Sequence, residues 1–180
     1  KTRAERDHNS IILRQSDRAG MDFFGYKVLD KATLASLEKQ LNEYGVKTER
    51  IPAGELLETG ERVRFQIPTG HMIELYADKT AVGSAVGNSS PDMDIIDQPG
   101  ITPIRLDHAL IYGTDLDGAT DLFTKVLGFT LVERVKLEDG QTDLGVWLTC
   151  SAKAHDIAMV RHGEPGKLHH VSFQLGSWEQ

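Results

Sequence analysis

The strongest constraint on the fold is a pattern of strands around one helix, which recurs on either side of a linker. The linker, residues 80–100, is rich in Gly, Ser and Pro, as segments between domains commonly are. Before it, strands are predicted at residues 9–14, 21–29, 62–66 and 72–76, the last two joined by a turn at residues 68–70. After it, strands are predicted at residues 104–112, 129–136, 142–149, 156–161 and 168–175.

Each half of the chain also has one helix signal. Asp30 is a suitable N-cap for a helix whose apolar residues recur at helical spacing up to Tyr44, and Gly45 ends it. In the second half, an apolar stripe from Ala119 to Leu127 predicts a helix that ends at Gly128. We therefore expect two similar α+β domains, residues 1–79 and 101–180, on either side of the linker.

A faint internal repeat supports duplication. An offset of 147 places His8 on His155 (155 − 8 = 147) and Arg14 on Arg161 without a gap. The same offset matches the strand at residues 21–29 with the strand at residues 168–175. We expect the first domain to lack its beginning and the second its end, because Lys1 is no initiator Met and a new helix is predicted to begin at Ser177.

Composition excludes several classes of protein. The chain of 180 residues has 39% hydrophobic residues, net charge −7 and one cysteine. No basic face or long apolar run is evident, so we expect neither nucleic acid nor a membrane as a partner. Cys150 has no partner for a disulfide, which favours a cytoplasmic setting, and we expect it to be a small buried residue rather than a nucleophile.

The histidines after residue 100 are the candidates for chemistry: His108, His155, His162, His169 and His170. Any one of them is more often an ordinary surface or hydrogen-bonded residue. His108, however, lies inside an apolar strand, where its ring needs a partner. Strict alternation in the strand at residues 168–175 places His170 on a polar face and His169 on the apolar face, so we select His170 as the ligand candidate.

Two neutral imidazoles from separate strands can bind Zn, Fe, Cu or Ni, and with a carboxylate they form the facial triad of non-haem Fe(II) oxygenases. No carboxylate after residue 100 is an obvious third ligand, since Glu164 lies in a polar turn and is expected to be solvated. The residues alone therefore leave the metal and the reaction open.

Several separate blocks carry a family resemblance. They are RLDHALIYG (105–113), DLFTKVLGF (121–129), AHDIAMV (154–160) and KLHHVSF (167–173), with GMDFFGYKV (20–28), PAGE (52–55) and PTGHMIELYAD (68–78) in the first half. In order and spacing they resemble the catechol 2,3-dioxygenase family, type I extradiol dioxygenases of the vicinal oxygen chelate superfamily. The resemblance implies tandem βαβββ modules in two domains, each incomplete, the first metal-free and the second catalytic.

The resemblance also implies the chemistry. His108 and His170 match the two iron-binding histidines, His155 matches a catalytic histidine beside the metal, and Trp147 matches a substrate-binding aromatic. The carboxylate ligand of the family would lie beyond Gln180, so we expect the chain alone to be inactive. The implied reaction is cleavage of catechol by dioxygen at Fe(II), giving 2-hydroxymuconate semialdehyde in the degradation of aromatic compounds, in a homotetramer.

The repeat suggests why the first domain would be metal-free. The counterpart of His170 there is Phe23 (170 − 147 = 23), which cannot bind a metal, so we expect Glu74 to be a structural strand residue. Two alternatives share the fold. One is a glyoxalase or epimerase that uses its metal as a Lewis acid, and the other is a metal-free small-molecule-binding module. Metal content and oxygen uptake would separate them.

Overall fold

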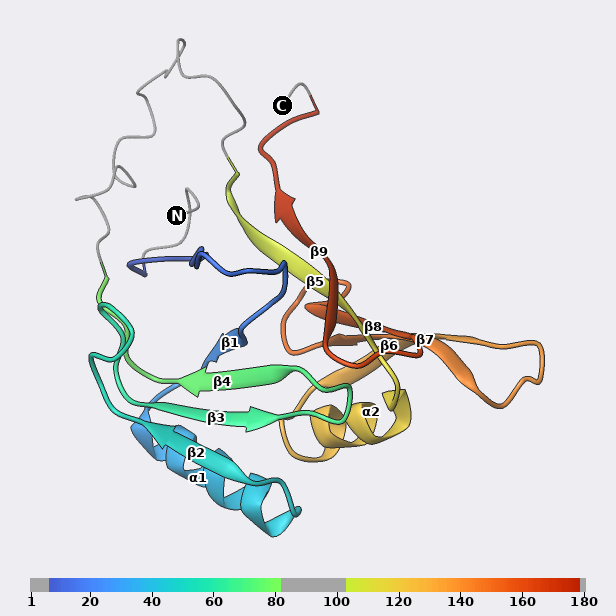
Figure 1. The fold of residues 1–180 in the computed structure, drawn as a ribbon, viewed down its shortest axis with the longest axis horizontal. Coiled ribbons are helices and arrows are strands. Elements are labelled where there is room, and N and C mark those ends of the chain that lie inside the picture. Colours follow the sequence, from blue (N-terminus) through green and yellow to red (C-terminus); the bar gives the residue numbers. More distant parts are fainter. Residues whose placement is uncertain (1–6, 82–102, 179–180) are drawn as a thin grey trace.

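The computed structural model describes residues 7–81 and 103–178. The first part contains β1 (Phe24–Lys27), α1 (Lys31–Glu43), β2 (Thr48–Ile51), β3 (Arg62–Gln66) and β4 (Met72–Tyr76). Its four strands form one sheet in the order β1-β4-β3-β2, in which β1 runs parallel to β4 and the other pairs are antiparallel. This part is therefore one βαβββ unit (Figure 1).

The second part repeats that arrangement and adds a strand. It contains β5 (Arg105–Gly113), α2 (Leu116–Lys125), β6 (Thr130–Lys136), β7 (Asp143–Thr149), β8 (Ile157–Arg161) and β9 (Lys167–Gln174). The sheet order is β6-β7-β8-β5-β9, with β5 parallel to β8, as β1 is to β4. The predicted α+β class and the tandem βαβββ units are confirmed, and β9 continues the sheet on the free edge of β5.

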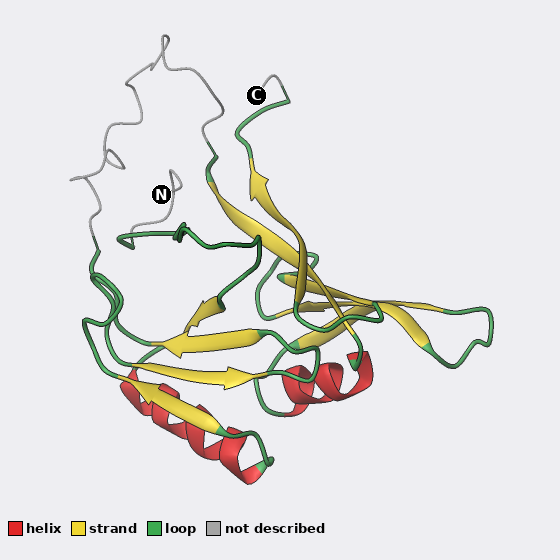
Figure 2. Cartoon of the chain, viewed as in Figure 1, coloured by secondary structure: helices red, strands yellow, loops and turns green. Residues whose placement is uncertain are grey.

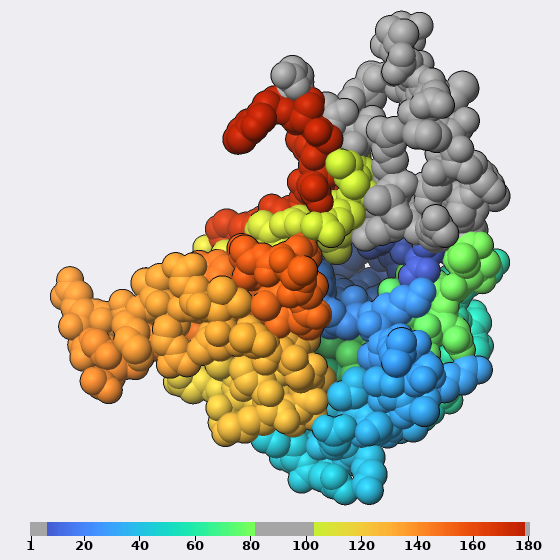
Figure 3. Space-filling model, turned by 180° about the vertical axis from the view of Figure 1, so that it is seen from behind, coloured from blue at the N-terminus to red at the C-terminus, as the bar shows by residue number. Residues whose placement is uncertain are grey.

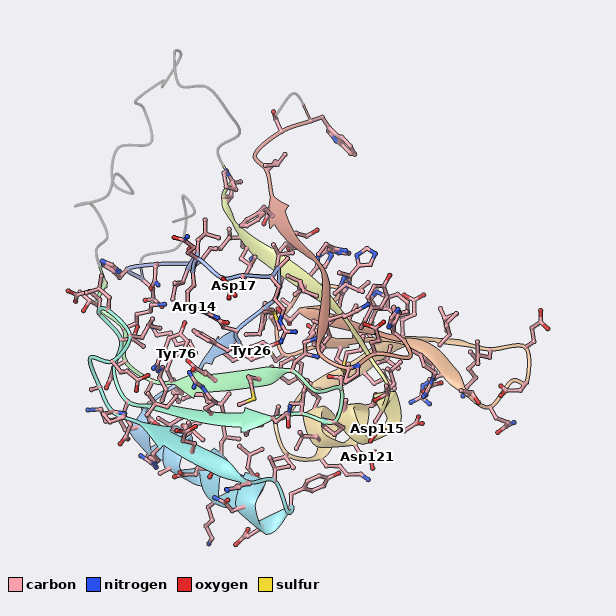
Figure 4. All side chains as sticks on the ribbon, in the orientation of Figure 1. Arg14, Asp17, Tyr26, Tyr76, Asp115 and Asp121 are labelled. Carbon is pink, nitrogen blue, oxygen red and sulfur yellow. The ribbon has the colours of Figure 1, made fainter. Side chains whose placement is uncertain are left out.

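Local sequence signals explain where the two helices begin and end. The Asp30 side chain accepts a hydrogen bond from the Thr33 amide at 2.7 Å and so caps α1, which ends before Gly45 at φ +95°. Asp115, labelled in Figure 4, caps α2 in the same way by accepting from the Gly118 amide at 2.8 Å. The predicted apolar stripes are largely buried, but Tyr44 at the end of the first stripe is 44% exposed. Figure 2 shows that both helices lie on the side of the molecule opposite to the end of β9.

The two sheets share one hydrophobic core. The Tyr26 ring on β1 packs edge-on against Phe129 at 5.4 Å and Phe123 at 6.5 Å between ring centroids. Buried residues of both units belong to the same cluster, including Leu41 from α1 and Leu122 from α2. The division into domains at residues 80–100 stays a prediction, because residues 82–102 lie outside the described part of the chain.

One predicted strand does not form, and one observed strand was not predicted. Residues 9–14 form an irregular exposed segment rather than a strand. β2 was missed because Thr48, Glu49 and Arg50 are mainly polar, and its hydrogen bonds to β3 place Ile51 alone fully in the core. Main-chain pairing with a strong neighbour, rather than side-chain burial, defines this edge strand.

β6 and β7 form a hairpin that projects from the sheet (Figures 1 and 3). The two strands are joined by a turn in which the Gly140 amide donates to the Leu137 carbonyl at 3.0 Å and Gly140 has φ +65°. Among the described residues, no helix has the length and apolar character needed to cross a membrane.

Candidate metal centre

His108 on β5 and His170 on β9 approach each other across two neighbouring strands. Their Nε2 atoms are 3.4 Å apart, and their ring centroids are 5.4 Å apart. β9 pairs with β5 in antiparallel register, with Leu110 opposite His170 and His108 opposite Ser172. Residues 108, 110 and 170 therefore lie on one face of the sheet, the face that does not pack against α2.

The strict alternation predicted for β9 is only partly right. It separates His170, which is half-buried, from the exposed His169. The register shifts between the pairs Leu110–His170 and Ile111–Leu168, so β9 has one extra residue, His169, at this point. Because of this irregularity, Leu168 pairs with the buried Ile111 and no longer shares the face of His170.

The outer nitrogen of each imidazole is already engaged. His108 Nδ1 lies 2.8 Å from a carboxylate oxygen of Asp107, and this hydrogen bond lowers the pKa of that carboxyl group. His170 Nδ1 lies 2.7 Å from His169 Nδ1. A proton on His108 Nδ1, donated to Asp107, leaves its Nε2 with a lone pair directed at His170, which is the usual arrangement of a metal-binding histidine.

The distance between the two Nε2 atoms suits two ligands of one metal ion. Two nitrogens bound to one ion at about 2.1 Å are separated by roughly 3.0–3.4 Å for angles near 90–110°. When each imidazole carries its proton on Nδ1, two lone pairs face each other, and a cation between them removes the repulsion. Burial, then the neighbouring His169 and His108, lower the pKa of His170, which favours the neutral form that binds metals.

A third protein ligand is not found in residues 7–81 and 103–178. No group of three or more His, Cys, Asp or Glu side chains there could hold a metal ion. Glu164, expected to be solvated, is exposed and pairs with Lys167 at 2.6 Å. Among the described residues, the two imidazoles therefore have no third protein group placed to bind the same ion.

His155 lies beside this pair. Its ring centroid is 4.3 Å from that of His108. Burial, followed by the proximity of His108, lowers the pKa of His155, so the ring is neutral and able to accept a proton near pH 7. The structure thus brings together three of the four predicted site residues.

Asp156 holds the loop before His155 in place, a role that we did not predict from the sequence. The Asp156 carboxylate accepts hydrogen bonds from Thr149 Oγ1 at 2.8 Å, the Cys150 amide at 2.8 Å and Ser151 Oγ at 2.9 Å, and it pairs with Lys153 at 2.7 Å. Burial alone would raise the pKa of this carboxyl group, but these donors lower it to about 2. A short loop rich in Ser, Thr and Lys before an Asp is the only signal that pointed to it.

Trp147 shares the face of the histidines but lies farther along the sheet. Register partners form a row across four strands, from Trp147 through Ala158 and Leu110 to His170. The half-buried indole of Trp147 lies next to Gly145, since a Cβ added to Gly145 would be 3.0 Å from the nearest atom of the indole ring. Ala158, which lies between Trp147 and Leu110 in this row, is fully buried.

Two other predictions have clear outcomes. Cys150 was expected to be buried but is exposed, because the turn anchored by Asp156 carries it to the surface. Partial burial and the Asp156 carboxylate raise the pKa of its thiol to about 11, so the thiol is protonated at neutral pH. Glu74 is buried and pairs with Arg64 at 2.5 Å and Arg62 at 3.3 Å, as a structural residue would.

Two sequence families match the chain. The family described as "Catechol 2,3-dioxygenase-like N-terminal domain" matches residues 21–80. The family described as "Glyoxalase/Bleomycin resistance protein/Dioxygenase superfamily" matches residues 105–180, which contain His108, His155 and His170.

Known proteins are similar along nearly the whole chain. Metapyrocatechase of Pseudomonas sp. (strain CF600) is 46% identical over 180 residues, covering 99% of this chain and 58% of that protein. The crystal structure of the 2,3-dioxygenase LapB from Pseudomonas sp. KL28 is 56% identical with a TM-score of 0.92, covering 99% of this chain and 62% of that one.

More distant relatives share the fold. Homoprotocatechuate 2,3-dioxygenase from Arthrobacter globiformis is 27% identical with a TM-score of 0.79, covering 96% of this chain and 51% of that structure. Manganese-dependent 2,3-dihydroxybiphenyl 1,2-dioxygenase of Geobacillus genomosp. 3 is 26% identical over 173 residues, covering 94% of this chain and 55% of that protein. The chain thus spans less than two thirds of the length of these relatives.

Proposed function

We propose that this chain, which belongs to the catechol 2,3-dioxygenase family of extradiol ring-cleaving dioxygenases, carries two metal ligands and a proton-transferring histidine of a catechol-cleaving site. The observation that carries the proposal is the approach of the His108 and His170 Nε2 atoms to 3.4 Å on one face of a sheet. His155 stands next to the same pair, with its ring 4.3 Å from that of His108.

The metal we propose is Fe(II), held by His108, His170 and a carboxylate from outside the described residues. Bound there, Fe(II) would bring the two hydroxyl oxygens of a catechol and dioxygen together and pass electrons between them. A relative named as manganese-dependent makes Mn(II) the alternative ion for the same ligands. With two histidines alone, this chain would hold either ion weakly and turn over no substrate.

His155 is the residue we assign to proton transfer. Its neutral ring can accept a proton from a catechol hydroxyl group and return it later, because an imidazole titrates near neutral pH. The Asp156 contacts hold the loop that carries His155, so the ring is placed without rearrangement. A fixed position is what a general base needs.

The other chain residues orient groups and exclude water. Asp107 fixes the His108 ring through Nδ1, which keeps Nε2 directed at the metal position. The half-buried side chains of Trp147 and Leu110 lie on the same face, on either side of the buried Ala158, and offer apolar contacts to an aromatic ring. Catechol is the substrate we propose, with 2-hydroxymuconate semialdehyde as the product, in a cytoplasmic homotetramer.

Oxygen uptake tests this proposal against its alternatives. The complete protein that contains this chain is loaded with Fe(II) without oxygen, then mixed with catechol and air. We expect one dioxygen consumed per catechol and the absorbance of a ring-opened semialdehyde, with loss of both in His155→Ala. Bound metal without oxygen uptake would instead indicate Lewis-acid chemistry, and absence of metal binding would indicate a small-molecule-binding module.

A further inference from the structure

The turn between β3 and β4 in the first unit contacts the strand that carries His170 in the second. His71 Nε2 lies 3.0 Å from the carbonyl oxygen of Lys167, the first residue of β9. The carbonyl oxygen of Thr69 accepts a hydrogen bond from the Gly166 amide at 2.8 Å. Two hydrogen bonds therefore join this turn to the main chain immediately before and at the start of β9.

The contact is closely packed. Thr69 is fully buried and His71 is 3% exposed. A Cβ added to Gly113, the last residue of β5, would lie 2.3 Å from the Thr69 Cβ, and one added to Gly70 would lie 2.8 Å from the Pro165 Cβ. The turn at residues 68–71 thus lies against the end of β5 and the turn that leads into β9.

The hydrogen bonds of His71 define its tautomer. His71 Nδ1 lies 3.0 Å from Thr69 Oγ1, and the Lys167 carbonyl can only accept, so Nε2 carries the proton. Thr69 then donates its hydroxyl proton to Nδ1. Burial lowers the pKa of His71, in agreement with a neutral ring. Each ring nitrogen has one partner, and the ring orientation is fixed by both.

The start of β9 matters because of the irregularity that follows it. Between Lys167, which pairs with Tyr112, and His170, which pairs with Leu110, β9 has one residue more than β5. The extra residue could lie at either of two positions along this segment. A slip of one residue between them turns the side chains to the opposite face of the sheet. A fixed Lys167 carbonyl selects one register, the one that directs His170 toward His108.

We propose that His71 is a positioning residue, by which the first βαβββ unit fixes the register of β9 and so the direction of the His170 imidazole. The inference rests on the proposed function insofar as His170 is a metal ligand. It gives the first unit a role in building the site that we propose in the second. Its action passes through the main chain of β9, and His71 itself touches neither metal nor substrate.

Two substitutions separate positioning from general stability. His71→Phe keeps a buried ring but removes the donor to Lys167, whereas His71→Gln can place an amide nitrogen near the position of Nε2. Val63→Ala, in β3 of the same sheet, removes core volume far from β9 and serves as the control for lost stability. The wild type and the three variants, each as the complete protein that contains this chain, are compared by urea unfolding, by amide hydrogen exchange and by Co(II) titration.

We expect His71→Phe to speed exchange of the amides at residues 167–171 by about tenfold or more relative to Val63→Ala, with Co(II) binding weakened by a similar factor. His71→Gln should restore both to near the wild-type values. Equal exchange and equal Co(II) affinity in His71→Phe and Val63→Ala would overturn the proposal. If the complete wild-type protein binds no Co(II), the proposed metal site fails, and exchange in β9 still decides the role of His71.

Discussion

The Nε2 atoms of His108 and His170 lie 3.4 Å apart although 62 residues separate them in the sequence. β5 and β9, adjacent strands of one sheet, bring the two rings together, and Asp107 and His169 engage the opposite nitrogens. The result is a pair of imidazoles that present lone pairs to one point. This relationship is the basis for the metal site that we propose.

Replacing Asp107 with Asn should weaken metal binding. Asn can still accept the His108 Nδ1 proton, but without the negative charge that makes the imidazole a better ligand. We expect Co(II) affinity to fall about tenfold, within the range seen for residues that orient metal-binding histidines. The measurement is a Co(II) titration, with Asp121→Asn on α2 as a control that removes an exposed ion pair with Lys125. Equal affinities in the two variants would contradict the orientation of His108 by Asp107.

Asp156 should contribute stability that depends on pH. Its folded pKa of about 2 lies below the ordinary value of 3.8, so the ionised form stabilises the fold above about pH 4. That contribution is lost as the pH falls from about 4 to about 2. The shift corresponds to ~2 kcal/mol, and solvent screening reduces our expectation to roughly 1 kcal/mol.

Urea unfolding of Asp156→Asn between pH 2 and pH 7 measures this contribution. The variant should be less stable than the wild type at pH 7, and the difference should shrink toward pH 2. A difference that is independent of pH would show that the loop of residues 149–156 is not held by the charge. His155→Ala, which leaves the Asp156 contacts in place, serves as the control.

Removal of the Glu74 carboxylate should strongly destabilise the first unit. The Arg62 side chain is 3% exposed and would be left without its buried partner. Breaking a buried ion pair in this way costs about 3–5 kcal/mol. Glu74→Ala is compared with Asp121→Ala, which removes an exposed pair on α2 and should cost less than about 1 kcal/mol. If the two variants lost similar amounts of unfolding free energy, this would indicate that water reaches the Arg62 side chain and solvates its charge.

Most elements could be predicted because their signals are local. Caps at Asp30 and apolar stripes along α1 and α2 depend on neighbouring residues, and β3 and β4 have the predicted bounds. β2 escaped prediction because its pairing with β3 depends on the neighbour rather than on its own four residues. Residues 9–14 have a strand-like sequence, but within the described residues they do not join a sheet.

Side-chain alternation predicted only part of the arrangement around His170. Alternation chose His170 over His169, but it could not foresee the extra residue that turns Leu168 away from that face. The contact of His71 with Lys167 spans 96 residues and joins two units, so no pattern within one strand reveals it. The many contacts of Asp156 depend on a loop conformation, which composition alone does not specify.

Co(II) titration of single histidine variants, made in the complete protein that contains this chain, tests the central claim most directly. His108→Ala and His170→Ala each remove one proposed ligand, while His162→Ala removes an imidazole from the turn after β8 that contacts Tyr112 rather than the pair. We predict that each of the first two variants loses measurable Co(II) binding with its fold retained, and that His162→Ala binds as the wild type does. Co(II) binding that persists in His170→Ala would contradict the assignment of His108 and His170 as a metal-binding pair.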